Sequence, residues 1–288
     1  MRPITLALIV VSAILSCTWN FLSKRSLDKQ AFLWLGLSMS AIIFLVPFCL
    51  FYTPFPKAGW LVALFSGCIE ALYYMMLGAA YQHGELSLVY PVARGFSPLV
   101  IACSAPLLLG EKISRLGAAG VAAIAAGIYT LHLRSTLRAD LLAPLRAIRA
   151  GQSRLALLIG IVIAGYSMLD KVGVRFVPPP LYAYLIFTIP AVILAPYMLS
   201  RRKAAVVAEW RANKRTVLLM PFLTAGAYTI VLLAMSTTQV SYVSSVREVA
   251  IVFAAIAGTI FLKEPFGRMK IAGSLLIFAG VLMIGLAR

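Results

Sequence analysis

The stretch PLLLGEKISRLGAAGVAAIAAGIYTL (residues 106–131) returns later in the chain as TIFLKEPFGRMKIAGSLLIFAGVLMI (residues 259–284). Aligned residue by residue, the two stretches share one glutamate and two glycines: Glu111 with Glu264, Gly120 with Gly273, and Gly127 with Gly280. Equivalent residues at one constant separation indicate an internal repeat, which bounds the architecture before any single element is assigned.

Two further matches extend the repeat into the earlier part of each half. WNFLSK (19–24) aligns with YSMLDK (166–171), and Tyr74 aligns with Tyr228. We therefore predict two similar halves and a basic connecting loop, at residues 1–135, 154–288 and 136–153.

The composition places the chain in a membrane. Of its 288 residues, 62% are hydrophobic and 12% are charged, and the mean hydropathy is +0.95. Soluble domains are about 45–50% apolar and about 25% charged. The basic residues behind the net charge of +17 lie mainly in short loops between apolar runs, as expected of a membrane protein, so we expect no nucleic acid partner. We predict an all-α polytopic protein whose surroundings are a lipid bilayer.

Ten apolar runs suit membrane-spanning helices, which need about 20 residues each. They are 4–22, 32–52, 60–81, 86–109, 115–132, 155–173, 181–200, 216–237, 241–262 and 270–287. Each half holds an odd number of spans, so the second half enters the membrane from the opposite side. Inverted repeats of this kind are typical of transporters that alternate access around a central cavity.

The loops predict an orientation. Most Lys and Arg residues fall in the segments 24–29, 133–154, 201–215 and 263–270, and the more basic side is normally cytoplasmic. Both termini are then outside. The first run shows no small-residue cleavage pattern, so we expect it to remain as a helix, and the lack of a targeting extension favours a bacterial inner membrane.

The fourth run contains YPVARGFSP (90–98), in which Arg94 lies between Pro91 and Pro98. A charge this deep in the bilayer is retained where it faces a cavity or a partner, and each proline removes a backbone donor. Irregular backbone at this depth must be covered by protein or water. We predict an interrupted helix, with the two prolines as hinges and Arg94 at a substrate cavity. The alternative is a kinked helix in which Arg94 forms an internal ion pair.

Other charges lie inside the runs. Glu70 is central in the third span, and Arg247 with Glu248 matches the position of Arg94 in the ninth. Successive residues on a helix point about 100° apart, so Arg247 and Glu248 each need another partner. We expect Glu70 to pair with Arg94 or Arg247.

The matching ends of the first and sixth spans also carry charges. Lys24 lies at the first, and Asp170 with Lys171 at the second. We expect both lysines to extend toward the membrane interface, because a long aliphatic stem can stay in the hydrocarbon while the ammonium reaches water.

Aromatic side chains lie on the same spans as these charges. An interfacial belt or ordinary helix packing would explain them, but hydroxyl groups near the middle of a span need partners, which a cavity wall would supply. We predict these substrate-binding residues: Arg94, Arg247, Glu248, Glu70, Trp19, Asn20, Tyr74, Tyr90, Tyr166 and Tyr228.

Spans 5 and 10 carry the repeated glycines among alanines and no charge. Small residues let two helices approach closely in a membrane. We therefore assign these two spans to scaffold contacts or to a homodimer.

GELSLVYPVARGFSPLVIACSAPLLLGEKIS and VSSVREVAIVFAAIAGTIFLKEPF, with their LLLGE and FLKEP ends, resemble the two halves of EamA-type proteins in the drug/metabolite transporter superfamily. The resemblance implies ten helices in two inverted repeats and a central cavity formed by spans 1, 3, 4, 6, 8 and 9. It also implies termini that are often cytoplasmic, in tension with the loop charges. Span 9 lacks the prolines of span 4, so the halves differ. The opening PITLALIVVSAILSCTWNFL more weakly resembles membrane proteins associated with phosphonate utilisation.

These features predict a gradient-driven, alternating-access transporter, an exporter or exchanger of a small polar or anionic metabolite. Arginine suits carboxylate and phosphate groups, and Glu70 or Glu248 would allow proton coupling. We expect no cofactor, metal or catalytic group, because no nucleotide-binding GxxxxGK[ST] motif, metal-ligand spacing or nucleophile–base set is present in the sequence. The closest alternative is a multidrug exporter of lipophilic cations; a membrane-embedded enzyme or a scaffold protein is a more distant one.

Overall fold

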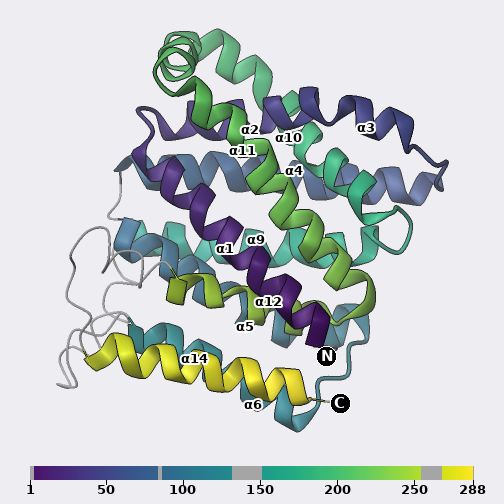
Figure 1. Cartoon of the computed structure of the whole chain (residues 1–288), viewed down its shortest axis with the longest axis vertical. Helices are drawn as coiled ribbons and strands as arrows, with labels where there is room; N and C mark the ends of the chain where they lie inside the picture. Colours follow the sequence, from purple (N-terminus) through teal and green to yellow (C-terminus); the bar gives the residue numbers. More distant parts are fainter. Residues whose placement is uncertain (1–2, 84–85, 132–150, 254–267, 288) are drawn as a thin grey trace. The chain divides into compact units, whose positions relative to one another are not determined.

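In the computed structural model, the regular elements of the described residues are all helices (Figure 1). The structure describes residues 3–83, 86–131, 151–253 and 268–287. The chain divides into two compact units: a first unit of residues 1–17, 84–164 and 238–288, and a second unit of residues 18–83 and 165–237. Each unit takes helices from both predicted halves, so the compact units do not follow the sequence repeat.

The first unit contains the start of α1 (Pro3–Arg25), α5 (Leu86–Leu109), α6 (Arg115–Leu131), the start of α9 (Gly151–Gly173), α12 (Val240–Arg247) and α14 (Arg268–Leu286). Helices α6 and α14 lie side by side along their length (Figure 1). Helix α12 packs against α5, α6 and α14.

The second unit contains the end of α1, α2 (Lys29–Ile43), α3 (Leu45–Leu50), α4 (Lys57–His83), the end of α9, α10 (Pro179–Arg201) and α11 (Lys203–Thr237). Helix α10 packs against α2, α4 and α11. The indole of Trp34 on α2 donates to the carbonyl oxygen of Ala191 on α10 at 3.0 Å, so a buried polar atom is satisfied where the two helices cross.

Helix length separates the predicted spans into two groups. Within the described residues, four helical stretches are long and apolar enough to cross a membrane: Pro3–Ser23, Lys57–Ala80, Pro179–Arg201 and Lys203–Thr237. Shorter apolar helices occupy Lys29–Ile43, Phe96–Leu109, Arg115–Thr130 and Ile271–Leu286. The all-α architecture is as predicted, and a total of ten crossings stays a prediction.

The predicted interruption of span 4 is wrong. Helix α5 is helical from Leu86 to Leu109, through both Pro91 and Pro98. A proline removes a donor but has a φ angle compatible with a helix, so α5 continues past both rings. That the two prolines act as hinges stays a prediction.

A break occurs instead in span 9, in the half that has no matching prolines. Helix α12 ends at Arg247, and Glu248 forms a turn (φ −71°, ψ −4°) before the helix resumes. Around the turn, the amide of Glu248 donates to Ser245 at 3.1 Å and that of Ile251 donates to Glu248 at 3.0 Å. These bonds span three residues, as in a tightened helical turn.

Span 2 is also broken, at Phe44 (φ −91°, ψ 5°), which separates α2 from α3. None of the residues of α3 is buried, and Phe48, which stacks on Tyr184, is its least exposed residue.

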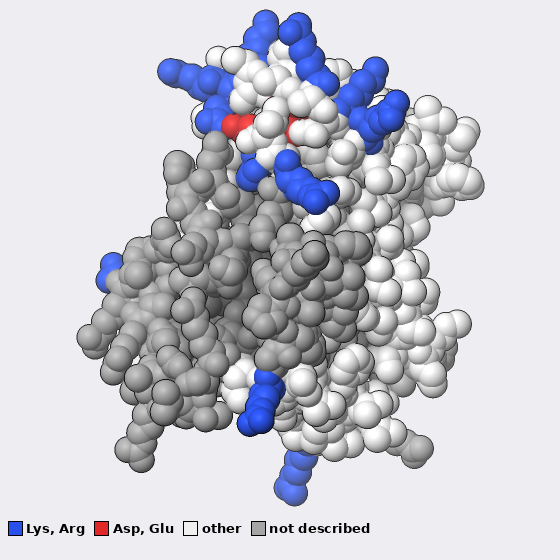
Figure 2. All heavy atoms as spheres, turned by 60° about the vertical axis from the view of Figure 1, so that its left-hand side comes forward, with Lys and Arg blue, Asp and Glu red and all other residues white. Residues whose placement is uncertain are grey.

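The predicted placement of two basic segments, 24–29 and 201–215, at one end is confirmed within the second unit, although residues 203–215 belong to helix α11 and not to a loop. Arg202, after α10, forms an ion pair with Asp28, before α2, and the amide of Asp28 donates to Glu209 on α11 at 2.8 Å. The two turns therefore lie at one end of the unit. Lys and Arg side chains gather around this end (Figure 2). The membrane orientation itself stays a prediction.

The opposite end of the second unit joins the turn before α4 to the turn before α10. A Cβ atom on Gly59 would lie 2.7 Å from Cγ2 of Val177 and 3.3 Å from Cβ of Phe176. The absence of a side chain at Gly59 therefore lets the two turns pack together. Exposed Lys57 and Arg175 flank this contact.

Glycines let α6 and α14 touch through their backbones. A Cβ atom on Gly120 would lie 2.8 Å from the carbonyl oxygen of Gly280, and one on Gly280 would lie 2.6 Å from that of Gly120. About two helical turns further along α6, a Cβ atom on Gly127 would lie 2.7 Å from the carbonyl oxygen of Gly273. The repeated glycine faces thus meet within one chain. A homodimer through these spans stays a prediction and would use other faces of the helices.

Replacing Gly280 with leucine should force α6 and α14 apart, because its side chain would meet backbone that has no room to move. Overpacking of this kind costs about 1–3 kcal/mol, so we expect a lower thermal unfolding temperature for Gly280→Leu in detergent. The neighbouring Ala279 is exposed, so Ala279→Leu is the matched control. Equal stability of the two variants would contradict the contact.

The LLLGE end of α5 acts as a capping device for α12. Gly110 has a left-handed φ of 66°, which ends α5 and lets the amide of Glu111 donate back to Ala105 at 3.4 Å. The Glu111 carboxylate then accepts from the amide of Val240 at 2.6 Å, and from the amide and hydroxyl of Ser241 at 3.3 and 2.6 Å. An anion at the first amides of a helix satisfies orphan donors and complements the helix dipole. Glu264, its repeat equivalent, lies outside the described residues.

Glu111→Ala should destabilise the start of α12 by about 0.5–2 kcal/mol, the usual cost of losing a helix cap. Lys112→Ala is the control, since its side chain is exposed and its backbone carbonyl, which accepts from Gln239 at 3.0 Å, is retained. Hydrogen exchange of the α12 amides would show faster exchange in Glu111→Ala alone. Unchanged protection in that variant would contradict the capping role.

Candidate functional site

A carboxylate, Asp170, is buried in the second unit and holds four helices together. Its side chain is fully buried and accepts hydrogen bonds from three hydroxyl groups. Ser66 of α4 donates at 2.5 Å, Tyr182 of α10 at 3.0 Å and Tyr228 of α11 at 2.5 Å. A buried carboxylate is tolerated when donors replace its water, so the position of Asp170 near the end of α9 dictates where these hydroxyls must lie.

A glycine makes room for one of these donors. A Cβ atom on Gly173 would lie 2.2 Å from Cε2 of Tyr182, so the tyrosine ring occupies the space that any other residue would need. Gly173 ends α9 one turn after Asp170. The C-terminal end of α9 therefore supplies both the acceptor, Asp170, and the space at Gly173 that the ring of its donor, Tyr182, occupies.

Further polar and aromatic groups surround Asp170, and together they form what we call the Asp170 cluster: Ser66, Glu70, Tyr73, Tyr166, Asp170, Tyr182 and Tyr228. Glu70 is 3% exposed and follows Ser66 by one helical turn, on the same face of α4. The Tyr166 ring lies 5.6 Å from that of Tyr73 and 6.3 Å from that of Tyr228. These separations are typical of aromatic pairs.

Lys171 adds a cation beside the cluster. Its ammonium donates to the carbonyl oxygen of Met235 at 2.5 Å, in the last turn of α11. A cation at a helix C-terminus satisfies a carbonyl that has no helical partner and complements the dipole. Lys171 thus binds the end of α11, and its expected position at the membrane interface stays a prediction.

The structure brings several of the predicted site residues together. Glu70, Tyr166 and Tyr228 belong to the Asp170 cluster. Tyr74 is partly buried, with its ring 5.1 Å from that of Tyr73. Trp19 is buried and Asn20 half-buried on α1, in the same unit.

The remaining predicted residues belong to the first unit. Arg247 and Glu248 are 8% and 2% exposed, so the charges at the break in span 9 are in the interior of the protein. Pro98 is buried. The side chains of Tyr90, Pro91 and Arg94 lie outside the described residues, and the pairing of Glu70 with Arg94 or Arg247 stays a prediction.

Sequence reasoning did not select Asp170, Ser66 or Tyr182 as site residues. Asp170 had a signal, since it lies four residues after Tyr166 and so on the same face of one helix. Ser66 likewise precedes Glu70 by four residues. Nothing in the local sequence pattern distinguishes Tyr182 from the other tyrosines of α10, because its role depends on a contact across helices.

Comparison with known proteins decides the family. The sequence pattern of the EamA-like transporter family matches residues 3–133 and again residues 154–286. The chain belongs to this family. The predicted resemblance is thus confirmed, and with it a membrane transporter of the drug/metabolite transporter superfamily that carries the family's two repeats.

Two further comparisons complete the picture of this EamA-family chain. A solved structure described as "Crystal structure of protein" is similar over 98% of this chain and 96% of its own, with a TM-score of 0.74 and 16% sequence identity. At that identity the likeness shows the fold. A search among curated proteins finds no match.

Removing one hydroxyl tests the role of the Asp170 cluster in this EamA-family protein. Tyr228→Phe keeps the ring but deletes a hydrogen bond to a buried carboxylate, which costs about 1.5–3 kcal/mol. We expect a clearly lower unfolding temperature in detergent. Tyr197→Phe on α10, with a ring 37% exposed, is the control and should leave stability unchanged. Equal unfolding temperatures would contradict the bond.

Proposed function

We propose that the protein is a gradient-driven secondary transporter in a bacterial inner membrane, and that it exports or exchanges a small polar metabolite bearing an anionic group. Membrane transport follows from the family; substrate class, direction and energy source are the proposal. The observation that carries it is the break in span 9, where α12 ends at the buried Arg247.

The break supports a substrate role for two reasons. Interrupted helices frame the substrate sites of many transporters. A buried guanidinium is also the side chain best suited to a carboxylate or phosphate, which it binds through two parallel hydrogen bonds. Arg247 combines both features, and Arg94 occupies the equivalent position in the repeat.

Buried carboxylates support coupling to protons. Glu70 and Glu248 are each at most 3% exposed, and a carboxylate that loses its water can exchange a proton when a ligand charge arrives or leaves. Asp170 is less suited to this role, because its carboxylate already accepts hydrogen bonds from three hydroxyls. Movement of the substrate would then be driven by an ion gradient and would need no enzymatic step.

A second candidate is the export of lipophilic cations. Four aromatic rings of tyrosine, at positions 73, 166, 182 and 228, lie in the Asp170 cluster together with two carboxylates, Glu70 and Asp170. Aromatic faces and carboxylates both attract organic cations. This observation favours a cation over an anion in the second unit.

Ligand-induced stabilisation separates the two candidates. A ligand present at about 100 times its Kd stabilises the folded protein by about 2.7 kcal/mol. We expect the purified protein to unfold at a higher temperature with small carboxylates or phosphonates, and Arg247→Gln to lose the shift. Arg268→Gln is the control, because Arg268 is exposed in the same unit.

The other results would exclude one proposal or both. A shift caused by lipophilic cations alone, retained in Arg247→Gln and lost in Glu70→Gln, would replace the anion with a cation. A shift by anions that persists in Arg247→Gln would remove Arg247 from the site. Proton coupling is tested by uptake into proteoliposomes with an imposed pH gradient, and flux that is independent of the gradient would contradict it.

A further inference from the structure

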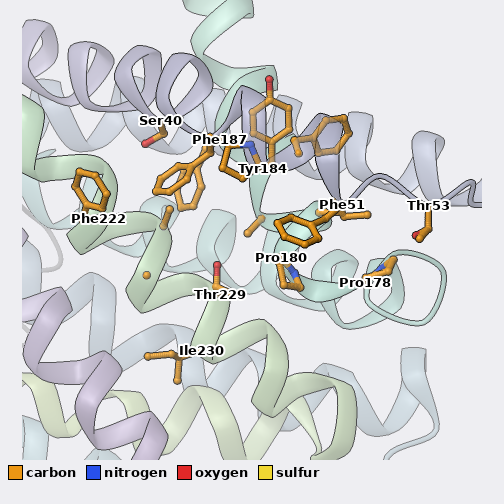
Figure 3. A pocket seen from close by; sticks show the side chains of 17 residues that line it. Ser40, Phe51, Thr53, Pro178, Pro180, Tyr184, Phe187, Phe222, Thr229 and Ile230 are labelled. Atoms are coloured by element: carbon orange, nitrogen blue, oxygen red, sulfur yellow. The ribbon is translucent and has the colours of Figure 1, made fainter.

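A groove of about 810 Å³ lies between α2, α3, α10 and α11 of the second unit. Figure 3 shows it running from Phe222 and Ser40 at one end to Thr53 and Pro178 at the other. Two aromatic pairs bridge its walls: Phe44 with Phe222 at 5.7 Å, and Phe48 with Tyr184 at 4.3 Å. The groove is therefore a formed feature of the fold.

The lining offers a ligand almost nothing but hydrocarbon. Aromatic rings, prolines and aliphatic side chains make up most of it, and its polar side chains are the hydroxyls of Ser40, Thr53, Tyr184 and Thr229. The lining contains no charged side chain. A polar or anionic metabolite would lose its water there without gaining partners, so the groove does not suit the transported substrate proposed above.

The length of the groove fits within one leaflet of a bilayer. The lining extends about 10 Å along α10, from Pro180 to Phe187, and about 12 Å along α11, from Phe222 to Ile230, at 1.5 Å per helical residue. One leaflet contributes about half of the roughly 30 Å hydrocarbon core. On α10 the lining begins at Pro180, at the start of the helix, so the groove extends from a membrane surface toward mid-bilayer.

One wall of the groove is open to the bilayer. Helix α3 buries none of its residues, and Leu50 and Phe51 at its end are 75% and 74% exposed. Phe222 on the facing helix α11 is 55% exposed. In a membrane protein, surfaces of this kind are covered by lipid chains.

Cations lie where a lipid headgroup would be. Lys57 is exposed and lies four residues after Thr53 in the sequence. Arg175 is also exposed and lies three residues before Pro178. Their two turns pack together through Gly59 and Val177. A phosphate at the surface end of the groove would thus meet positive charge.

We infer that this groove is a binding site for a bilayer phospholipid, with one acyl chain between α3, α10 and α11 and the phosphate beside Lys57 and Arg175. The acyl chain fits the length, the apolar lining and the open wall of the groove. The headgroup fits the charge at its surface end.

Gly226 provides a direct test, because it lines the groove and a Cβ atom there would have nothing within 4 Å. The Cβ atom of a phenylalanine at this position meets no protein atom and its ring would take up space in the groove, so folding should be kept. Gly226→Leu is a smaller variant of the same kind. Leu219→Phe is the matched control, since Leu219 is 47% exposed on the same helix and lies outside the lining.

The protein would be reconstituted with phosphatidylglycerol, extracted in mild detergent and examined by native mass spectrometry. We expect one retained phospholipid on the wild type and on Leu219→Phe, less on Gly226→Leu, and none on Gly226→Phe. Lys57→Ala combined with Arg175→Ala should lower retention, whereas Arg215→Ala, at the other end of the unit, should not.

Two results would overturn the inference: a wild type that carries no phospholipid, or a Gly226→Phe variant that retains as much phospholipid as the control. If that variant also lost the thermal shift produced by a transported ligand, the groove would be part of the substrate path. Retention of lipid is measured without transport, so failure of the proposed substrate class leaves this test intact.

Discussion

A single buried carboxylate constrains the second unit. Asp170 has no contact with water, and a charge in that position is stable only while the hydroxyls of Ser66, Tyr182 and Tyr228 point at it. Those hydroxyls come from three other helices, so the relative depth and rotation of α4, α9, α10 and α11 are tied to one side chain. Apolar packing alone would allow these helices to slide, because lipid and leucine offer nearly the same surroundings.

In the first unit, close backbone contacts and a helix cap position the helices. Helices α6 and α14 approach until their carbonyl oxygens lie where Cβ atoms would be, and the glutamate after α5 caps α12. That cap fixes the start of a helix whose other end is the break at Glu248. The LLLGE sequence at the end of α5 therefore has a physical role: Gly110 turns the chain, and Glu111 anchors the start of the helix that ends at the buried Arg247.

The sequence predicted the features that depend on composition and repetition. Apolar runs indicated the helices, and loop charges placed the turns of Asp28 and Arg202 at one end of the second unit. The repeated glycines marked α6 and α14 as packing helices without showing that they pair with each other. Features that depend on contacts between helices were missed. Asp170 resembled other charges near the end of a span, and Tyr182 had no pattern of its own. The interruption assigned to Pro91 and Pro98 was wrong because a proline limits local hydrogen bonding without deciding whether a helix continues.

The groove and the Asp170 cluster share two helices and one side chain. Phe187 of α10 lines the groove, and its ring lies 6.1 Å from that of Tyr228, which donates to Asp170. On α11, Gly226 and Thr229 face the groove on either side of Tyr228 in sequence. An acyl chain packed against Phe187 would restrict the ring that positions Tyr228, because close-packed interiors transmit small displacements. The bilayer would then contribute to the geometry of a buried polar cluster that it never touches, and a change of lipid would alter the site through packing alone.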